Sequence, residues 1–141
     1  MSRIEQVTTI RLATHTDARG NLTVVQSDKD IPFSISRVFY IHGAPADCER
    51  GAHAHHDSEQ VVIALAGSLS LEVTDSRRTA TFVLNEPDRA VYLPRMIWAR
   101  MFDFRANTVC LVLASTPYEA SDYIRSWDDY VAAVAAVAET P

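Results

Sequence analysis

Residues 51–67 read Gly51-Ala52-His53-Ala54-His55-His56-Asp57-Ser58-Glu59-Gln60-Val61-Val62-Ile63-Ala64-Leu65-Ala66-Gly67. The second half of this stretch is typical of a buried strand that ends at a turn glycine. His53 and His55 are two residues apart, and on a β-strand this spacing places both imidazoles on the same face. Such a pair predicts a pocket in which the imidazoles either bind a metal ion or transfer protons.

Length and composition predict one domain over residues 1–141. With 48% hydrophobic residues, the 141-residue chain can bury a core without disulfides. Cys48 and Cys110 are far apart and lack metal-ligand spacing, so we expect free thiols in a reducing compartment. No apolar run approaches the roughly 20 residues of a membrane span, and residues 1–5 lack a signal-peptide core. We therefore expect a cytoplasmic protein that does not enter a membrane.

The charge argues against nucleic acid as a partner. The formal net charge is −5 and the pI is about 5.4, which is the wrong sign for a phosphate-backbone groove. Twelve of the thirteen basic residues are arginine, whose guanidinium can bind phosphate or carboxylate in a bidentate manner. The base composition of the genome and surface salt bridges would explain this excess of arginine equally well. Only individual arginines near the histidines therefore suggest a binding role.

Short β-type segments separated by turn signals fill most of the chain and predict a sandwich or a barrel. The expected strands cover residues 7–12, 22–25, 34–41, the segment with His53 and His55 and the buried run 60–66 that follows it, 69–73, 79–84, 90–93, 97–102 and 109–114. Near the C-terminus, Ser126-Trp127-Asp128-Asp129 resembles a capping box and opens an Ala- and Val-rich helix at Tyr130–Ala138. No repeat or linker interrupts the sequence.

An all-β chain with Gly-x-His-x-His before a strand and a glycine turn resembles the cupin superfamily. This resemblance implies a cupin double-stranded β-helix, or jelly-roll barrel, at about residues 7–115, followed by a short α-helix at about 127–138. Metal-binding cupins carry a Glu where this chain has Gln60 and a third His where it has Ala99. Because zinc or iron normally needs at least three protein ligands, we expect no metal and no other cofactor.

Further segments narrow the resemblance to one cupin family. They are Asp17-Ala18-Arg19-Gly20-Asn21-Leu22, residues 31–41, Arg50-Gly51-Ala52-His53-Ala54-His55, Leu113-Ala114-Ser115 and Asp122-Tyr123-Ile124-Arg125. Together they resemble the nucleotide-sugar 3,4-ketoisomerases, the WxcM-like family with an RmlC-like jelly roll. The resemblance implies a cofactor-free enzyme that converts dTDP-4-keto-6-deoxy-D-glucose to a 3-keto-6-deoxyhexose. It also implies a homodimer with exchanged strands, for which Val7–Leu12 is the candidate.

The histidines fit this chemistry. Moving a ketone from C4 to C3 needs a base for the C3 proton, an acid that protonates C4, and donors for the intermediate oxyanion. The family motif carries over to His53, His55 and Tyr40 as the catalytic set. We favour His53 as the C3 base with His55 as its partner, and the reverse assignment stays open. The phenol of Tyr40 would donate to the oxyanion or relay a proton.

Five residues are expected to bind the substrate. Arg19, Arg37 and Arg50 flank the motifs and could hold a diphosphate through bidentate contacts. Gln60 could hydrogen-bond a sugar hydroxyl or orient an imidazole. Arg100 is the nearest polar group in the strand after Pro94, although a regular strand would turn it to the other face.

Three other functions remain as alternatives. An RmlC-type sugar epimerase would exchange the C3 and C5 protons and keep the ketone at C4. A metal-dependent cupin, such as a dioxygenase, would hold stoichiometric metal. A non-catalytic cupin would bind the nucleotide sugar without proton exchange. The sequence does not assign the galacto or gluco configuration of the product.

Overall fold

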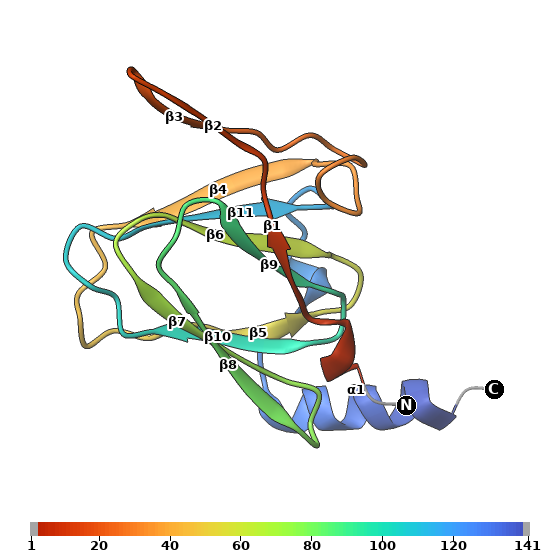
Figure 1. Ribbon diagram of the computed structural model, residues 1–141. Coiled ribbons are helices and arrows are strands. Elements are labelled where there is room, and N and C mark those ends of the chain that lie inside the picture. Colours follow the sequence, from red (N-terminus) through yellow and green to blue (C-terminus); the bar gives the residue numbers. More distant parts are fainter. Residues whose placement is uncertain (1–2, 140–141) are drawn as a thin grey trace.

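The computed structural model describes residues 3–139, and Figure 1 shows two β-sheets facing each other with a helix beneath them. The first two and last two residues of the predicted domain lie outside this range. The strands are β1 (Thr8–Arg11), β2 (Thr14–Asp17), β3 (Gly20–Thr23), β4 (Arg37–His42), β5 (Arg50–His55), β6 (Gln60–Ala66), β7 (Leu69–Thr74), β8 (Thr79–Leu84), β9 (Arg89–Leu93), β10 (Trp98–Phe102), β11 (Val109–Ala114) and β12 (Tyr123–Ile124). The helices are the 3-10 turns η1 (Ile4–Gln6) and η2 (Ala120–Asp122), and α1 (Trp127–Glu139).

The two main sheets are antiparallel and have five strands each. Their orders are β1-β9-β6-β11-β4 and β12-β5-β10-β7-β8, and the hairpin β2–β3 stands apart. From β4 to β12, strands adjacent in sequence therefore alternate between the sheets except for the hairpin β7–β8, which is the crossing pattern of a jelly roll. The predicted all-β cupin barrel with a C-terminal helix is confirmed.

Strand β6 shows why its sequence is an uninterrupted apolar run. Val62 and Ala64 point between the two sheets, into the core that also contains Leu71 and Val112. Val61 and Ile63 point outwards, but a second hydrophobic cluster covers them. A strand buried on both faces needs apolar residues at every position rather than at alternate positions.

Two segments outside the barrel cover the outer faces of the two sheets. Leu12, Ile31 and Phe33 lie over the outer face of the sheet that contains β6 and β9. On the other sheet, Tyr130 of α1 is fully buried, and its hydroxyl donates to the carbonyl oxygens of Thr74 (3.1 Å) and Met96 (2.9 Å). The C-terminal helix is therefore part of the packed structure and fixes the segment that precedes it.

The predicted elements match the observed ones with local differences. Helix α1 begins at Trp127, as expected for a helix at about 127–138 and three residues before the Ala- and Val-rich run that starts at Tyr130. The hydroxyl of Ser126 accepts the Asp129 N–H (3.3 Å) as a capping box requires. Two strands were not predicted, Thr14–Asp17 and Tyr123–Ile124. Both are short and lack an apolar alternation, so their formation depends on the partner strand rather than on their own sequence. Within residues 3–139, no helix has the length and apolarity that a membrane crossing requires.

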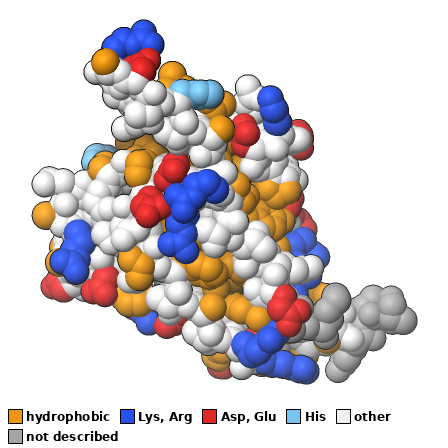
Figure 2. Space-filling model, in the orientation of Figure 1, with side chains coloured by type: hydrophobic (Ala, Val, Ile, Leu, Met, Phe, Trp, Pro, Cys, Tyr) orange, Lys and Arg blue, Asp and Glu red, His pale blue; other side chains and the backbone are white. Residues whose placement is uncertain are grey.

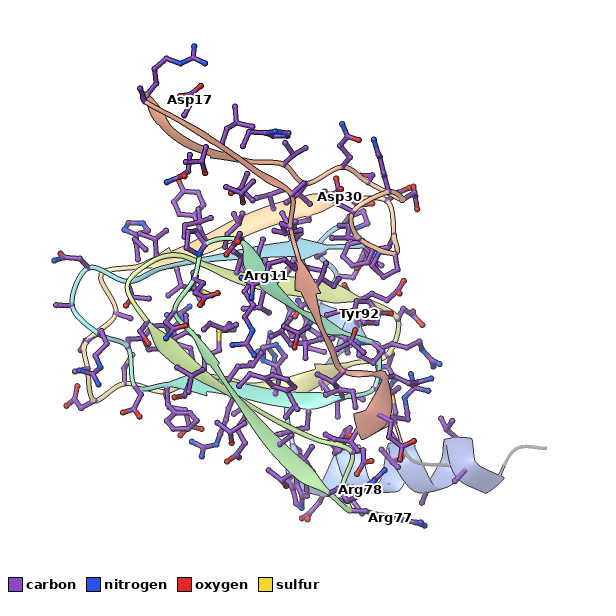
Figure 3. The ribbon with its side chains drawn as sticks, viewed as in Figure 1. Arg11, Asp17, Asp30, Arg77, Arg78 and Tyr92 are labelled. Atoms are coloured by element: carbon purple, nitrogen blue, oxygen red, sulfur yellow. The ribbon has the colours of Figure 1, made fainter. Side chains whose placement is uncertain are left out.

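The hairpin β2–β3 projects from the body of the molecule. Figure 1 shows it extending beyond the sheets, and Asp17 lies at its tip in Figure 3. All four residues of β2 are exposed, and Leu22 on β3 is 60% exposed. In Figure 2 the hairpin forms a separate protrusion, with hydrophobic side chains visible where it joins the body. An exposed two-stranded hairpin has little stability of its own, which suggests a partner surface.

Gly67, the turn glycine after β6, allows a stability prediction. It has φ +76°, and a Cβ at this position would lie 2.6 Å from the Cα of Thr108. Gly67→Ala should lower the free energy of unfolding by about 2–5 kcal/mol in urea denaturation, because backbone strain and overpacking add. Gly43→Ala is the matched control, since Gly43 has φ +68° but no heavy atom within 4 Å of the added Cβ. Equal losses in both variants would show that the contact with Thr108 contributes nothing.

Candidate active site

A β-bulge in β5 precedes the two histidines. On the neighbouring strand β10, Ala99 pairs with His53 and Arg100 pairs with Gly51, so Ala52 is an extra residue. Gly51 (φ 85°) and Ala52 (φ 58°) both have positive φ, and glycine tolerates this conformation where a bulge begins. Beyond the bulge the strand is regular, and His53 and His55 point between the two sheets.

The imidazoles of His53 and His55 lie side by side within the barrel. Their ring centroids are 5.0 Å apart and their planes are nearly perpendicular. The ring of Tyr123, on the short strand β12 beside β5, contacts both, at 4.9 Å from His53 and 4.4 Å from His55. The predicted pair therefore shares one wall, with a tyrosine from the C-terminal segment against it.

A buried carboxylate holds His55. Oδ2 of Asp122 lies 2.8 Å from Nδ1 of His55, and the two side chains are 8% and 7% exposed. The second oxygen of Asp122 accepts the backbone N–H of Asp57 at 2.7 Å. On the other side of the ring, Nε2 of His55 lies 3.3 Å from Nε2 of Gln60. His55 is thus fixed at both nitrogens.

Burial sets the protonation states of these groups. Burial, with a smaller contribution from His55, lowers the pKa of His53 to about 4. Burial also lowers the pKa of His55, although Asp122 acts in the opposite direction. Burial would raise the pKa of Asp122, but hydrogen bonds from Asp57 and His55 outweigh it and hold that pKa below its ordinary value. At neutral pH both imidazoles are neutral and Asp122 is a carboxylate.

These charges define the tautomer of His55. An ionised carboxylate can only accept a hydrogen bond, so Nδ1 of His55 carries the proton and donates it to Asp122. Nε2 then has a free lone pair and can accept from the amide of Gln60. A neutral imidazole with Nε2 unprotonated is a general base, and the carboxylate behind it stabilises the imidazolium that forms when it takes a proton.

The pocket around the histidines is otherwise mostly apolar. Ser58 and Gln60 are the other polar lining residues, and the remaining walls are Gly51, Leu93, Pro94, Ile97, Ala99 and Met101. Among residues 3–139, no three His, Cys, Asp or Glu side chains gather in a metal-binding arrangement. Gln60 and Ala99 occupy the positions where the cupin pattern would place two further ligands. The arrangement offers two bases in a mostly apolar pocket, which suits proton transfer next to a carbonyl.

Comparisons with known proteins agree with this geometry. The model of the family described as FdtA, WxcM-like, C-terminal, matches residues 5–135. The chain belongs to this family. A curated relative from Aneurinibacillus thermoaerophilus, TDP-4-oxo-6-deoxy-alpha-D-glucose-3,4-oxoisomerase, is 39% identical over 114 residues, covering 81% of this chain and 82% of the relative. The predicted WxcM-like family and isomerase class are confirmed.

Two solved structures from Campylobacter jejuni are similar over most of their length. WlaRB, named as a TDP-quinovose 3,4-ketoisomerase, has a TM-score of 0.88 and 36% identity, covering 92% of this chain and 99% of WlaRB. WlaRA, named as a TDP-fucose-3,4-ketoisomerase, has a TM-score of 0.84 and 33% identity, covering 88% of this chain and 92% of WlaRA. The jelly-roll barrel described above is therefore shared with ketoisomerases of this family.

Two of the predicted arginines lie near the histidines. Arg37 starts β4, and its charge acts to lower the pKa of His55. Its guanidinium carbon lies 5.6 Å from the centre of the Tyr118 ring, and its buried Nε has no hydrogen-bond partner among the described residues. Arg50 pairs with Met101, a core residue of β10. Because paired residues on antiparallel strands point to the same side, the bulge turns Arg50 to the pocket face, where it is exposed at the rim.

The structure does not bring Tyr40 to the pocket. Phe39 and Ile41 of β4 pack against the core, so Tyr40 points away from it and is 62% exposed. Its ring lies against His42, the next outward residue, at 5.6 Å. The alternation that groups Tyr40 with Val38 and His42 describes the outer face of β4, so within one chain Tyr40 does not face the pocket and its catalytic role stays a prediction.

Arg100 lies on the outer face of β10, to which a regular strand was expected to turn it. It pairs with Gly51 on the outer face of β10, and its guanidinium bonds to Glu72 (2.9 Å) and Glu49 (3.2 Å). The ring of Phe102 lies 4.3 Å from the same guanidinium. A regular strand turns Arg100 away from the pocket, and these partners hold it on the outside.

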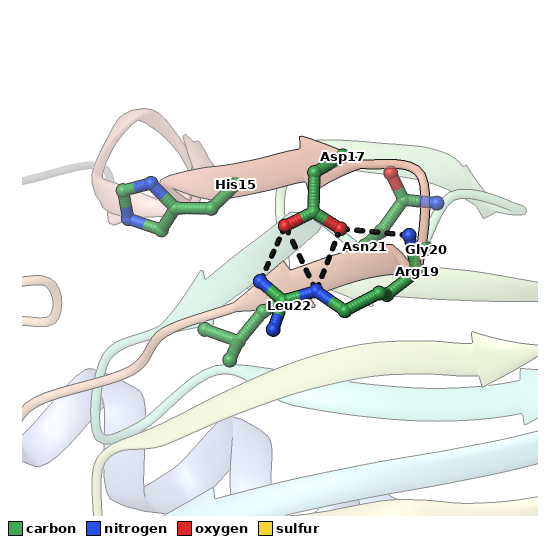
Figure 4. A pocket seen from close by; sticks show the side chains of 6 residues that line it. All are labelled: His15, Asp17, Arg19, Gly20, Asn21 and Leu22. Atoms are coloured by element: carbon green, nitrogen blue, oxygen red, sulfur yellow. Dashed lines mark hydrogen bonds and ion pairs between the residues drawn. The ribbon is translucent and has the colours of Figure 1, made fainter.

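Arg19 lies on the projecting hairpin, apart from the histidines of its own chain. Its side chain is 90% exposed and forms an ion pair with Asp17 (2.6 Å). Figure 4 shows this pair beside an open hollow whose walls all belong to the hairpin. In the part of the chain that the structure describes, the partner of Arg19 is Asp17 of the same hairpin and not a residue of the histidine pocket.

Asp122 and Tyr123 are the site residues that sequence reasoning missed. Both belong to the Asp-Tyr-Ile-Arg segment, which contributed to the family resemblance without a role assigned to either side chain. Tyr123 pairs with His55, which brings the segment against β5. An acidic residue in a segment that follows the last barrel strand was the available signal, but its partner is 67 residues away in sequence.

The Asp122–His55 contact predicts a change in titration. Asp122→Asn should lower the pKa of His55 further, because the carboxylate is the main group that raises it. Imidazole NMR titration would measure the shift. Asp57→Asn is the control, since the side chain of Asp57 is exposed and only its backbone N–H contacts Asp122. An unchanged or raised midpoint for His55 in Asp122→Asn would contradict the assigned hydrogen bond.

Proposed function

We propose that this chain is a sugar 3,4-ketoisomerase that moves the ketone of dTDP-4-keto-6-deoxy-D-glucose from C4 to C3 without a metal or other cofactor. The observation that carries the proposal is the pair of neutral imidazoles 5.0 Å apart in an apolar pocket, one of them held by Asp122. The substrate follows from the name of the curated relative. The family alone would leave the substrate open, and the imidazole pair supplies the chemistry that this substrate needs.

The two histidines would act as base and acid. A neutral imidazole takes the C3 proton while the C4 carbonyl becomes an enediolate oxygen, and the resulting imidazolium supplies the proton for C4. His55 is the better base on its geometry, because Asp122 stabilises its protonated form. The imidazolium of His55 would then return the proton at C4, with His53 beside it as a proton relay. This reverses the order favoured from sequence, although both assignments use the same pair.

Cationic and amide donors would hold the substrate. The free Nε of Arg37 and its position near His55 suit a developing oxyanion or a phosphate oxygen. Arg50 at the rim suits the diphosphate. Gln60 can donate to a sugar hydroxyl in addition to its contact with His55. These three residues come from β4, β5 and β6, so binding groups surround the reacting atoms on several sides.

Substitution of the histidines tests the catalytic pair. His53→Asn and His55→Asn should each lower kcat with dTDP-4-keto-6-deoxy-D-glucose by roughly 10²–10⁴-fold, the usual contribution of general acid–base groups. His56→Asn is the matched control, because His56 follows the pair directly but is exposed. The rate would be followed as 3-keto sugar formed in NMR spectra. Wild-type rates in both pocket variants, with folding confirmed by circular dichroism, would exclude the mechanism.

We further propose a cytoplasmic homodimer in which the β2–β3 hairpin, rather than β1, crosses between subunits. Strand β1 pairs with β9 of its own chain, so the segment expected to exchange already has its partner. Within residues 3–139 the hairpin pairs with no other strand, and it carries Arg19 away from its own histidines. Exposed apolar residues on the outer face, among them Val38 (53%) and Leu65 (46%), would be covered. The free thiols of Cys48 and Cys110 suit the cytoplasm.

Mixing inactive variants tests the exchange. If the hairpin supplies Arg19 to the partner's pocket, an Arg19→Ala protein mixed with a His53→Asn protein regains roughly a quarter of wild-type activity, because half of the dimers are mixed and each has one intact site. A His53→Asn and His55→Asn mixture is the control, since these residues share one pocket and no intact site can form. No recovery in the first mixture, with subunit exchange verified, would place Arg19 outside the partner's site.

A further inference from the structure

Ser58 is a buried polar residue of the histidine pocket that has no part in the proton transfer described above. It lies in the turn between β5 and β6, and turn residues are usually exposed. Its neighbours His56 and Asp57 are exposed, but Ser58 is only 2% exposed and lines the same pocket as His53 and His55. A hydroxyl in this position is a candidate contact for the substrate.

The backbone turns the side chain of Ser58 into the barrel. Pairing of β6 with β11 continues one residue beyond Gln60, because the Ser115 N–H donates to the carbonyl oxygen of Glu59 at 2.9 Å. The Glu59 N–H in turn donates to Oγ of Ser115 at 2.8 Å. Alternation along this extended strand therefore places Ser58 on the same side as Gln60 and Val62, which is the side that faces the core.

The hydroxyl of Ser58 has only a weak partner within residues 3–139. It contacts the carbonyl oxygen of Glu59 at 3.4 Å, which is longer than the roughly 2.5–3.0 Å of an ordinary O–H···O hydrogen bond. A buried hydroxyl is costly unless it forms a good hydrogen bond. Ser58 therefore gains most from a ligand atom that can accept its proton in a hydrogen bond.

The cavity that Ser58 lines fits one substituent of a sugar ring rather than the ring itself. Its volume is about 20 Å³, which admits a single oxygen-sized group. Gln60 and the two histidines are its other polar walls, while Leu93 and Ile97 offer no hydrogen bond. An oxygen on one of the reacting carbons is the part of the substrate that can enter this cavity while the imidazoles reach the carbon protons.

We propose that the Ser58 hydroxyl donates a hydrogen bond to the C4 oxygen of the substrate as the enediolate forms. When the C3 proton leaves, its electron pair forms the C3=C4 double bond and the C4 carbonyl oxygen becomes negatively charged. A hydroxyl held beside that oxygen bonds more strongly to the charged form than to the ketone. Ser58 keeps its own proton, so it stabilises the intermediate without transferring a proton to carbon. The inference rests on the proposed ketoisomerase function.

Kinetics of two Ser58 variants with dTDP-4-keto-6-deoxy-D-glucose test this contact. Ser58→Ala should lower kcat by roughly 10–100-fold, the effect of losing a hydrogen bond to a charged group, with a smaller change in KM. Ser58→Cys fills the space of the hydroxyl with a weak donor, so its kcat should stay close to that of Ser58→Ala. Wild-type kcat in Ser58→Ala, or recovery in Ser58→Cys, would show that Ser58 only fills space and would overturn the proposal.

Ser115→Ala is the matched control. It removes the side-chain contact to the Glu59 N–H from the same turn and keeps the Ser58 hydroxyl. Its kcat should stay near the wild-type value. An equal loss in Ser115→Ala and Ser58→Ala would assign the effect to the position of the turn and would overturn the direct contact.

The pH profile of kcat separates a direct contact from an effect through Asp122, whose pKa a hydrogen bond from the Ser58 backbone helps to lower. Because a serine hydroxyl does not ionise near neutral pH, Ser58→Ala should lower kcat without moving the profile. A shifted profile would mean that the variant acts through Asp122 and His55, and it would overturn the direct contact while leaving the ketoisomerase function intact. If the wild-type protein forms no 3-keto sugar, the proposed function and the inference fail together.

Discussion

The hydrogen bond between Asp122 and His55 joins the C-terminal segment to the barrel. His55 lies on a central barrel strand, while Asp122 belongs to the segment that returns after the last barrel strand and leads into α1. The backbone N–H of Asp57 and the pairing of Tyr123 with His55 hold that segment in place. A buried carboxylate is costly unless it is paired. The same contact therefore positions the C-terminal segment and gives His55 its tautomer.

The surroundings of the imidazoles explain why they are neutral. The histidines line the open part of a barrel whose remaining interior is packed with aliphatic side chains. Removing water from an imidazolium is unfavourable, so burial lowers the pKa of both rings. In the same surroundings an enediolate would depend strongly on its few donors, because charges interact more strongly at low dielectric. The apolar core thus supports the chemistry as well as the fold.

The sequence predicted elements better than side-chain directions. The spacing of His53 and His55 placed them on one face because β5 is regular after its bulge. The same reasoning could not place Arg50, since the bulge at Gly51 and Ala52 changes the alternation. The exposed position of Tyr40 was not predicted, because alternation shows which residues share a face but not whether that face is buried.

Long-range partners were the second limit of the sequence. The contact of Asp122 with His55 depends on the path of the chain around the barrel, and nothing near either residue indicates it. For Arg100, strand alternation indicated the outward direction, but its partner Glu72 on the neighbouring strand β7 followed only from the structure. The projecting hairpin was a third case, because β2 has no apolar alternation and forms only against β3. Local pattern therefore predicted the barrel, and the tertiary path decided which polar residues reach its interior.

The most direct test of the account is proton NMR of dTDP-4-keto-6-deoxy-D-glucose with the purified protein in D₂O. The account predicts loss of the C3 proton signal and growth of a 3-keto sugar. Its C5 proton is retained, because His53 and His55 transfer protons at C3 and C4 only. Exchange at C3 and C5 with the ketone still at C4 would indicate an epimerase. An unchanged spectrum would show that the histidine pair does not act on this substrate, and either result would contradict the account.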